Sequence, residues 1–402
     1  MRILQINAVN KIGSTGRNCA EIAEYMNAQG DVCRTVFSVG EEDGSSVRIS
    51  TAAECRIHAV LSRVTGMQGY HSPFATRRLI HYIESFQPDI VHLNNLHANY
   101  LSLNMLLPCL ARKNIATAVT LHDCWLYTGK CTHYSSLGCS RWLTGCHDCP
   151  KLKEDHNSWF FDRTDVMWED KRNWFREIPA LGVIGVSRWI TGEAEKSPVF
   201  AKAKQIECIY NWIDLDIFRP LNGCEDIREA YGLKKNRIVL GVASRWGEAK
   251  GLGQFLSLAE MLPADVRIVL LGDLPRMRLP ENVINIPATG SLRKLVEVYN
   301  TADVFVQLSR EESFGKVVAE ALACGVPVVT NSGTANPELV DPTCGVVAGN
   351  TTEEIYRAVS TVLDSGKALY SPYCRAFAQE HFSKDTCLKQ YRTFYSKLLS
   401  GK

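Results

Sequence analysis

The stretch Glu311–Gly325, which reads EESFGKVVAEALACG, decides how the rest of the chain is interpreted. Glu312 is followed by the small and flexible step Ser313-Phe314-Gly315, so we expect a loop here and a helix that begins near Lys316. The free backbone N–H groups at a helix start attract anions. Glu320 would lie deeper on the same helix, and carboxylates beside such a start can accept hydrogens from sugar hydroxyls.

Apolar runs flank this stretch on both sides. Val304–Leu308 before it and Val326–Thr330 after it each predict a strand. The candidate site would then lie at the carboxyl end of a strand in a β-α-β unit. Open α/β sheets bind their ligands at that edge.

Length and composition narrow the class of protein. The chain has 402 residues, which is too long for one ordinary core, so we expect two domains. A net charge of +2 with 46% hydrophobic residues favours a soluble globular enzyme and gives no support for nucleic-acid binding. No apolar run reaches the ~18 residues that span a bilayer, and Met1–Ile6 predicts a first strand rather than an export signal. The fifteen cysteines are therefore expected to be mostly reduced, cytoplasmic thiols.

The N-terminal end carries a strand and a glycine-bearing loop. Arg2–Asn7 predicts the strand, the loop contains Gly13 and Gly16, and Asn18–Gly30 has helical spacing. The loop lacks the third glycine of the dinucleotide fingerprint, so NAD binding is not supported. The two remaining interpretations are a phosphate- or substrate-facing loop and an ordinary turn between a strand and a helix.

Polar side chains follow two further predicted strands, Ile90–Asn94 and Ala116–Leu121. His97 comes shortly after the first strand, and His122 with Asp123 directly follows the second. Polar groups at the carboxyl ends of successive strands suit a ligand cleft, although any single histidine there is more often structural. His122 is the strongest candidate because it ends its strand and an acid follows it.

A cysteine cluster occupies the segment from residue 129 to residue 150. Cys146-x-x-Cys149 has the spacing of a metal knuckle, and Cys131 with Cys139 could complete a tetrahedral thiolate set. We therefore expect a structural zinc ion that holds a long insertion. A redox pair and four unlinked thiols are the alternatives, since the first two cysteines are spaced more loosely than in common zinc ribbons.

An aromatic and basic segment, Asn157–Trp174, follows the cysteines. Its tryptophans, phenylalanines and interleaved cations could lie at a membrane surface or line a lipid-linked acceptor site. Simple packing of the insertion onto its domain is the more common outcome for such a mixture.

The second half of the chain restarts the alternation of strands and helices after a connection near Asn211. Asp214 and Asp216 in that connection resemble a metal-binding acidic pair, but no strand end precedes them. Arg237–Ala243 predicts a strand, and Arg245 and Lys250 follow it around a glycine turn. Two cations there would form a clamp for a pyrophosphate, whereas either one alone is more often a surface charge.

Together these residues resemble a known family. Glu312 and Glu320, with seven residues between them, are similar to the EX7E signature of retaining GT-B glycosyltransferases in glycosyltransferase family 4. The segments around Arg245, Asn211 and Gly16 resemble further motifs of the family in the expected order, with Trp212 where glycine is usual. The His122 segment and the cysteines after it resemble a subgroup from bacterial polysaccharide and capsule assembly.

The resemblance implies an α/β protein of GT-B architecture, with two Rossmann-like domains that face each other across a cleft. The expected domains are residues 1–210 on the acceptor side, with an insertion at about 125–175, and residues 211–384 on the donor side. Residues 385–402 should form a helix that crosses back to the first domain.

The resemblance also assigns roles to residues. Glu320 should bind the ribose hydroxyls, and Glu312 with the backbone of Ser313, Phe314, Gly315 and Lys316 should hold the donor sugar. Arg245 and Lys250 should bind the diphosphate. Gly16 and His122, which belong to the first domain, should lie near the phosphate and the donor sugar.

The function implied is retaining transfer of a hexose, without a catalytic metal, from a UDP- or GDP-sugar to a glycan or lipid-linked oligosaccharide acceptor. The product would be a polysaccharide such as a capsule or lipopolysaccharide, made in the cytoplasm or at the inner face of the cell membrane. A sugar-nucleotide epimerase or phosphorylase of the same fold, and a non-catalytic scaffold in a polysaccharide-assembly complex, are the alternatives.

Overall fold

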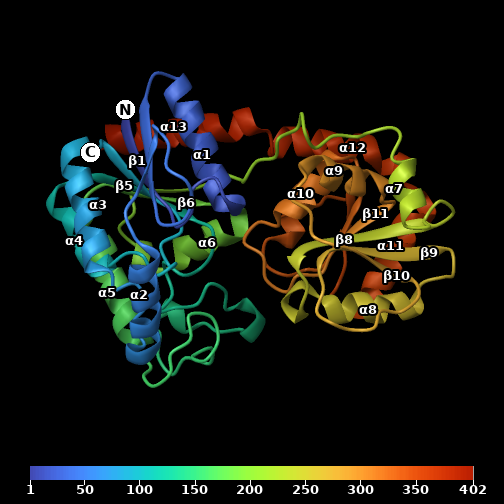
Figure 1. Ribbon diagram of the computed structural model, residues 1–402, viewed down its shortest axis with the longest axis horizontal. Helices are drawn as coiled ribbons and strands as arrows, with labels where there is room; N and C mark the ends of the chain where they lie inside the picture. The colour runs from blue at the N-terminus through green and yellow to red at the C-terminus, as the bar shows by residue number, and fades with distance from the viewer. Residues whose placement is uncertain (402) are drawn as a thin grey trace. The chain divides into compact units, whose positions relative to one another are not determined.

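A computed structural model describes residues 1–401, which form two compact units. The N-terminal unit comprises Met1–Ile209 together with the C-terminal residues from Leu388 onward, and the C-terminal unit is Tyr210–Cys387. The expected divisions lay at residues 210/211 and 384/385. Each unit is a parallel sheet with helices packed on it (Figure 1).

The sheet of the N-terminal unit has seven parallel strands in the order β3-β2-β1-β4-β5-β6-β7. Every residue of the central strands β4 and β5 is buried, because helices cover both faces of a parallel sheet. The strands are β1 Arg2–Ile6, β2 Val32–Phe37, β3 Ser46–Arg48, β4 Ile90–Leu93, β5 Ala116–Leu121, β6 Leu181–Gly185 and β7 Gln205–Cys208.

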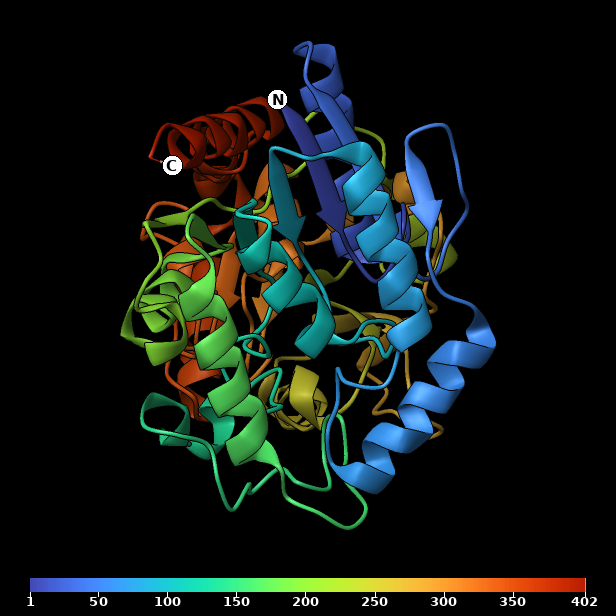
Figure 2. The same cartoon turned by 90° about the vertical axis from the view of Figure 1, so that its left-hand side faces the viewer.

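The helices of this unit include α3, α4 and α5, which lie next to one another in front of the sheet in Figure 2. The N-terminal unit holds α1 Gly13–Ala28, α2 Ala52–Thr65, α3 Pro73–Phe86, α4 Leu103–Arg112, α5 Thr164–Glu177 and α6 Arg188–Lys196. Helix α13 (Lys384–Ser400) enters from the other unit and packs on the sheet. An ideal Cβ on Gly182 in β6 would lie 2.7 Å from the Phe394 ring, so a larger residue would push α13 off the sheet.

The C-terminal unit has six parallel strands in the order β10-β9-β8-β11-β12-β13. The chain winds outward from β8 in one direction and then returns to start again at β11, so the two adjacent strands β8 and β11 form a topological switch point. The strands are β8 Arg237–Arg245, β9 Val266–Asp273, β10 Val283–Ile286, β11 Val304–Gln307, β12 Val328–Thr330 and β13 Gly345–Val347.

The apolar faces of the helices in this unit meet the sheet in a continuous hydrophobic core, to which α8 and α11 contribute most of the helical side chains. The unit holds α7 Glu225–Ala230, α8 Leu252–Met261, α9 Leu292–Thr301, α10 Lys316–Ala323, α11 Thr352–Ser365 and α12 Lys367–His381.

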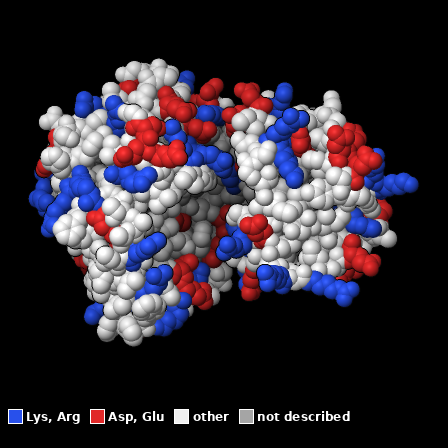
Figure 3. All heavy atoms as spheres, viewed as in Figure 1, with Lys and Arg blue, Asp and Glu red and all other residues white. Residues whose placement is uncertain are grey.

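Most of the predicted elements lie where the sequence places them, but the start of α1 does not. The helix begins at Gly13, so Gly16 belongs to its first turn and not to a preceding loop. Of the two glycines, Gly13 has a positive φ, of 64°, as does Lys11 two residues before it, with 58°, and the helix continues from Gly13 on. No helix among the described residues is long and apolar enough to cross a membrane. Cations and anions are intermixed on the face of each unit drawn in Figure 3.

Candidate functional site

The switch point of the C-terminal unit brings together the loops that follow β8 and β11. Arg245 is the last residue of β8, and the short helix Glu248–Lys250 follows it. Gly251 ends that helix with a φ of 74°, and an ideal Cβ there would lie 2.5 Å from the Cβ of Leu308. Glycine therefore lets the first loop rest directly against the end of β11.

The close contact places Lys250 beside Glu312. The Lys250 Nζ lies 2.5 Å from the Glu312 Oε1, and the Gln307 side chain lies 3.4 Å from the same oxygen. The backbone of Glu312 is held as well, since its N–H donates to the Thr334 hydroxyl at 2.8 Å. Two of the predicted site residues, Lys250 and Glu312, thus form an ion pair at the carboxyl edge of the sheet.

The Ser313-Phe314-Gly315 step is anchored by its aromatic ring. Phe314 is buried, and its ring centroid lies 5.9 Å from that of Tyr210 and 5.5 Å from that of Phe382. Gly315 has a φ of 84° and precedes α10, which has no side-chain cap at its N-terminus. The Phe314 side chain is thus turned into the unit, and α10 begins two residues after it. Backbone N–H groups at a helix start favour a nearby anion.

Glu320 lies in the second turn of α10 and is 7% exposed. One of its carboxylate oxygens accepts a hydrogen bond of 2.8 Å from the Tyr299 hydroxyl. Burial and this carboxylate raise the pKa of Tyr299 well above its ordinary value, so Tyr299 stays protonated and acts as the donor. Tyr299 thereby fixes the direction of the Glu320 side chain.

Arg245 is exposed and lies on the same edge of the sheet as the Lys250–Glu312 pair. The structure therefore brings Lys250 and Glu312 into contact and places Arg245 at the same edge, while Glu320 lies further along α10 with Tyr299 as its partner. Thr334, Gln307 and Tyr299 support these residues and were missed. Thr334 lies 22 residues beyond the glutamate it holds, and nothing in the local pattern marks it.

The N-terminal unit places polar side chains at the ends of β4 and β5. The His122 Nε2 lies 3.2 Å from the Asn94 Oδ1, and the His97 Nε2 lies 2.8 Å from the Asp123 Oδ2. Burial alone would raise the pKa of Asp123, but the charge and hydrogen bond of His97 outweigh it and lower that pKa. His122 is half-buried, and the His97–Asp123 pair lies beside it. The sequence marks His97 and Asp123 as polar residues that follow strands, but it does not predict that they pair with each other.

Gly16 is buried in the first turn of α1, against the loop that leaves β1. An ideal Cβ there would lie 3.1 Å from the Lys11 backbone nitrogen and 3.1 Å from a methyl group of Val9. The position thus allows the loop after β1 to approach the helix closely. Gly16 and His122 belong to the N-terminal unit, whereas the other predicted donor-binding residues belong to the C-terminal unit.

The four clustered cysteines, Cys131, Cys139, Cys146 and Cys149, line one small cavity of about 20 Å³. The Cys131 thiol hydrogen-bonds to Cys149, which lowers the pKa of Cys149 to about 7. The backbone N–H of Gly129 donates to the Cys146 sulfur at 3.2 Å. Within residues 1–401, no three His, Cys, Asp or Glu side chains are already arranged to hold a metal ion.

Two buried lysines hold the insertion that carries these cysteines. The Lys171 Nζ donates to the carbonyls of Trp125, Thr128 and Gly129 at 2.7, 2.9 and 3.2 Å. The Lys130 Nζ donates to three more carbonyls at 2.9 to 3.0 Å. Lys171, one of the cations interleaved with the aromatic residues of Asn157–Trp174, is therefore buried and not at the surface, and burial lowers its pKa to about 7.

Comparison with known sequences identifies similar families in both halves. The family described as Glycosyltransferase Family 4 matches residues 15–217, which is half of the chain, and the family described as Glycosyl transferases group 1 matches residues 237–365. A protein described as a colanic acid biosynthesis glycosyl transferase, WcaC of Escherichia coli (strain K12), is 26% identical over 323 residues, covering 77% of each chain. A GDP-mannose-dependent phosphatidylinositol dimannoside mannosyltransferase of Mycobacterium tuberculosis is 29% identical over 160 residues, covering 38% of this chain and 42% of its own.

Solved structures match the whole chain. Sucrose-phosphate synthase from Thermosynechococcus elongatus has a TM-score of 0.71 at 16% identity and covers 100% of this chain and 99% of its own. HepE from Anabaena, solved in complex with UDP and glucose, has a TM-score of 0.66 at 16% identity and covers 99% of this chain and 100% of its own. At these identities the likeness concerns the fold, which is that of the GT-B glycosyltransferases.

Proposed function

The chain belongs to glycosyltransferase family 4, and from that premise we propose that it transfers a hexose, with retention of configuration, from a nucleotide-diphosphate sugar to an acceptor in polysaccharide biosynthesis. The single observation that carries the proposed site is the Lys250–Glu312 ion pair at the switch point of the C-terminal unit. It brings a phosphate-binding cation and a hydroxyl-binding carboxylate within reach of one ligand.

The donor would be held by chemically different parts of this edge. Arg245 and Lys250 supply fixed positive charge for the diphosphate, and the N–H groups at the start of α10 add their dipole. Glu312 would accept hydrogen bonds from the sugar hydroxyls, and the adjacent backbone N–H groups would donate hydrogen bonds to the sugar. Glu320 would bind the ribose hydroxyls. His122 and Gly16 are assigned, from their family positions, to contacts near the donor sugar and phosphate.

The chemistry follows from these groups. As the bond between the anomeric carbon and the phosphate oxygen breaks, negative charge grows on the diphosphate, and the cations and helix start stabilise it. The acceptor oxygen attacks from the same face and forms the new bond, while its proton passes to the departing phosphate oxygen. Glu312 would orient the sugar and form no bond with it, so we propose that the step needs no metal ion.

The donor is proposed to be a UDP- or GDP-sugar. Support for each nucleotide comes from a similar protein, since HepE was solved with UDP and the mycobacterial relative is named as GDP-mannose-dependent. The acceptor is proposed to be a glycan or a lipid-linked oligosaccharide, because the similar E. coli protein is described by colanic acid biosynthesis. All fifteen cysteines are free thiols. Free thiols are typical of proteins in the reducing cytoplasm, so we propose that the protein acts on the cytoplasmic side, at the inner face of the cell membrane.

The test is a transfer assay with a panel of UDP- and GDP-sugars, chosen first by thermal shift and followed by mass spectrometry of the product. Glu312→Ala and Arg245→Ala should each abolish transfer, and Glu311→Ala is the neighbouring control that should keep it. Lys250→Ala should weaken donor binding by about 1.5–3 kcal/mol, the contribution of one charge-assisted hydrogen bond.

Three outcomes would contradict the proposal. Epimerised sugar or phosphorolysis in place of transfer would assign a different reaction to the same fold. Full transfer by both the Glu312→Ala and Arg245→Ala variants would move the site elsewhere. A covalent sugar adduct trapped on Glu312 would replace front-face attack with double displacement.

We further propose that the four clustered cysteines close on one structural zinc ion. They already line one cavity, whose volume of about 20 Å³ is near that of a single small occupant. Backbone N–H groups also donate to the sulfurs of Cys146 and Cys149. Burial nevertheless raises the pKa of Cys146 to about 11, so a bound zinc ion would have to displace the proton of this thiol.

Metal analysis of the purified protein should find about one zinc per chain, which the double variant Cys146→Ser/Cys149→Ser should lose together with stability of the N-terminal unit. Cys208→Ser, at a half-buried cysteine outside the cluster, is the control and should keep the zinc. A protein that is free of metal and fully stable would reject the zinc site.

A further inference from the structure

Thr334, whose hydroxyl accepts from the N–H of Glu312, has a backbone conformation that threonine rarely adopts. Its φ of 45° lies in the left-handed region, where the Cβ crowds a carbonyl oxygen and a β-branched residue is a clear outlier. Seven non-glycine residues among residues 1–401 have a positive φ, and Thr334 is the one of them that is β-branched. Strained conformations of this kind cluster at ligand sites and persist where the surrounding structure fixes them.

The residue before it, Gly333, shows where this loop does need a glycine. The φ of Gly333 is not positive, but an ideal Cβ there would lie 3.1 Å from the Arg310 carbonyl oxygen. Glycine thus occupies the crowded position, whereas the left-handed position, which glycine would adopt without strain, carries a side chain. We therefore ask what the Thr334 side chain contributes.

Hydrogen bonds on both sides of Thr334 hold the loop that follows β12. The Asn331 Nδ2 donates to the Ser309 carbonyl at 3.0 Å, and the Asn336 Nδ2 donates to the same carbonyl at 3.2 Å. The Asn336 Nδ2 also lies 2.8 Å from the Asn331 Oδ1, and both asparagines are buried. Because these bonds flank Thr334, they can maintain its unfavourable φ. They also tie this loop to the start of the loop that follows β11.

The far end of the loop after β11 is Glu312, and both of its backbone groups are held. Its N–H donates to the Thr334 hydroxyl at 2.8 Å, and its carbonyl accepts from the Ala335 N–H at 3.3 Å. Rotation about φ of Thr334 would carry that hydroxyl and that N–H away together, since both lie beyond the rotated bond. The left-handed φ of Thr334 therefore keeps the backbone of Glu312 in place.

A fixed backbone matters at Glu312 because its carboxylate has two tasks. Its Oε1 lies 2.5 Å from the Lys250 Nζ, and 18% of its side chain stays accessible to a ligand. In the proposed function this carboxylate accepts from hydroxyls of the donor sugar, whereas the nucleotide half is held by other residues. Whatever directs Glu312 should then affect the sugar and spare the nucleotide.

We infer that Thr334 is a positioning residue for sugar recognition: its hydroxyl and its left-handed backbone fix the direction of the Glu312 carboxylate. The inference rests on the proposed function and deepens it, because it assigns the geometry of sugar binding to a loop outside the Glu312–Glu320 motif. The strain at Thr334 is then the cost of keeping a hydroxyl on the Glu312 N–H.

Three substitutions separate the hydroxyl from the strain. Thr334→Ala removes the hydroxyl and keeps the strain, Thr334→Gly removes both, and Thr334→Ser keeps the hydroxyl. Thr334→Gly should melt at a higher temperature than Thr334→Ala, because glycine adopts a positive φ freely. The Glu312 amide should exchange its hydrogen about fivefold faster in Thr334→Ala and Thr334→Gly, the effect of one lost hydrogen bond, and at the wild-type rate in Thr334→Ser.

Calorimetric titration of the full chain then compares two probe pairs, UDP-glucose with UDP and GDP-mannose with GDP. Thr334→Ala and Thr334→Gly should lower the affinity for the nucleotide sugar by about fivefold without lowering that for the bare nucleotide. Thr334→Ser should keep both affinities. Glu312→Ala/Thr334→Ala should bind the nucleotide sugar no more weakly than Glu312→Ala alone, since Thr334 acts through Glu312.

The matched control is Ser332→Ala, which removes a hydroxyl two residues away in the same loop. Ser332 is exposed, and its hydroxyl accepts from the Asn350 side chain at 3.2 Å. This variant should match the wild type in the exchange of the Glu312 amide and in both affinities. A merely structural role for Thr334 would make sugar binding follow melting temperature, so that Thr334→Gly would bind better than Thr334→Ala.

Wild-type sugar affinity in Thr334→Ala would overturn the inference, as would a Thr334→Ser variant that binds as weakly as Thr334→Ala. Equal losses for the nucleotide and the nucleotide sugar would also overturn it, because local unfolding would then explain them. Exchange of the Glu312 amide that follows the hydroxyl, in a protein that transfers no sugar, would uphold the positioning of Glu312 and refute the proposed activity.

Discussion

Helices α2 and α11 begin in the same way and face in opposite directions. Both have 14 residues, and both start with a capping box, Thr51 with Glu54 in one and Thr351 with Glu354 in the other. Helix α11 buries its apolar side chains, such as Val359, in the core of the C-terminal unit. Helix α2 buries polar side chains and exposes its apolar ones.

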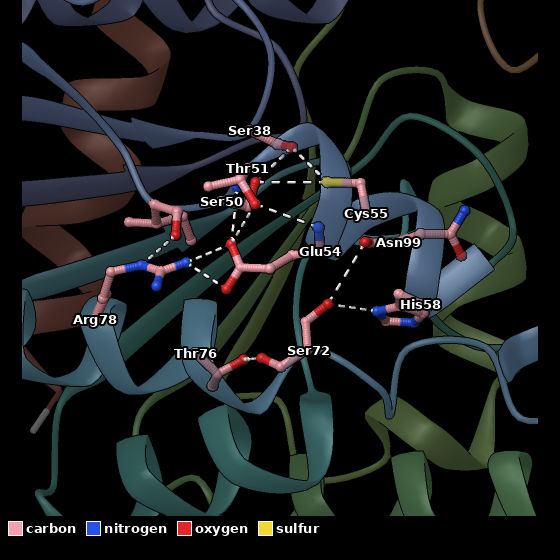
Figure 4. Close-up of polar contacts among 11 residues, drawn as sticks. Ser38, Ser50, Thr51, Glu54, Cys55, His58, Ser72, Thr76, Arg78 and Asn99 are labelled. Carbon is pink, nitrogen blue, oxygen red and sulfur yellow. Dashed lines mark hydrogen bonds and ion pairs between the residues drawn. The ribbon is translucent and has the colours of Figure 1, made fainter. Parts of the chain in front are cut away.

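The two helices contribute to their units in different ways. In the C-terminal unit the apolar face of α11 stabilises the sheet that positions the candidate donor site. In the N-terminal unit the ion pair between Glu54 and Arg78 holds α2 (Figure 4). A hydrogen bond between His58 and Ser72 holds it as well, so its apolar side chains stay exposed. The two units differ in titratable side chains as well. Nine of the ten histidines lie in the N-terminal unit, and His381 lies in the C-terminal unit.

The largest expected effect comes from placing the same charge on each helix. Val359→Glu should destabilise the C-terminal unit by about 4 kcal/mol or more, because a fully buried position would receive a carboxylate without a partner. Val60→Glu should change the free energy of unfolding by no more than about 0.5 kcal/mol, since the side chain is half exposed. Denaturant unfolding measures both, and similar costs at the two positions would break the comparison.

An intermediate effect is expected from pH. Burial, together with the nearby His71, lowers the pKa of His58 to about 3. In the unfolded chain His58 takes up its proton near pH 6.5, so its contribution to stability is complete above that pH. It is lost as pH falls toward 3, at roughly 1.4 kcal/mol per pH unit. Helix α11 contains no histidine, so between pH 6.5 and 5 we expect faster amide hydrogen exchange in α2 while α11 stays protected.

The control for this prediction is His58→Asn, which keeps a polar side chain and removes the titration. Its α2 should exchange at a rate that is independent of pH over the same range, after correction for the intrinsic exchange rate. Exchange that still rises as pH falls in His58→Asn would assign the effect to another group. The neighbouring His71 would be the first to examine, since its ring centroid lies 5.6 Å from that of His58.

The smallest expected effect concerns the capping box, which both helices have at their start. Thr51→Ala and Thr351→Ala should each cost about 1 kcal/mol, because each removes one hydroxyl that accepts from the N–H of a glutamate in the first turn. Equal losses of melting temperature, measured per unit, would show that the two starts are equivalent. A much larger loss in Thr51→Ala would mean that the ion pair between Glu54 and Arg78 depends on the capping box.

Much of the fold could be predicted from the sequence because its elements are short and clearly bounded. Ala116–Leu121 and Val304–Leu308 form the strands β5 and β11 that their apolar runs predict, the second one residue shorter than predicted. The helix start at Gly13 was placed too late, because two glycines close together favour a loop until the backbone is seen. The grouping of Lys250 and Glu312 was predictable, since both follow strands that end on one edge.

Other features depend on contacts that no local pattern records. An apolar stripe on a helix does not tell which face is buried, so α2 and α11 cannot be distinguished by spacing. Lys171 looks like a surface cation in an aromatic segment, but three carbonyls of a distant loop surround its ammonium group. Thr334 and Tyr299 hold Glu312 and Glu320 from positions about 20 residues away, where only the folded chain brings them near.

The ion pair between Lys250 and Glu312 has a consequence for the order of events in the proposed reaction. A diphosphate that takes Lys250 as its partner must displace the carboxylate, which then needs another donor. An intact nucleotide sugar brings hydroxyl groups that satisfy Glu312, so the exchange of partners is complete. The spent nucleotide has no sugar, and its diphosphate would face a carboxylate left with the long, 3.4 Å hydrogen bond from the Gln307 side chain. The enzyme would thus hold its substrate more firmly than its by-product, and re-formation of the pair would help to clear the site for the next turnover.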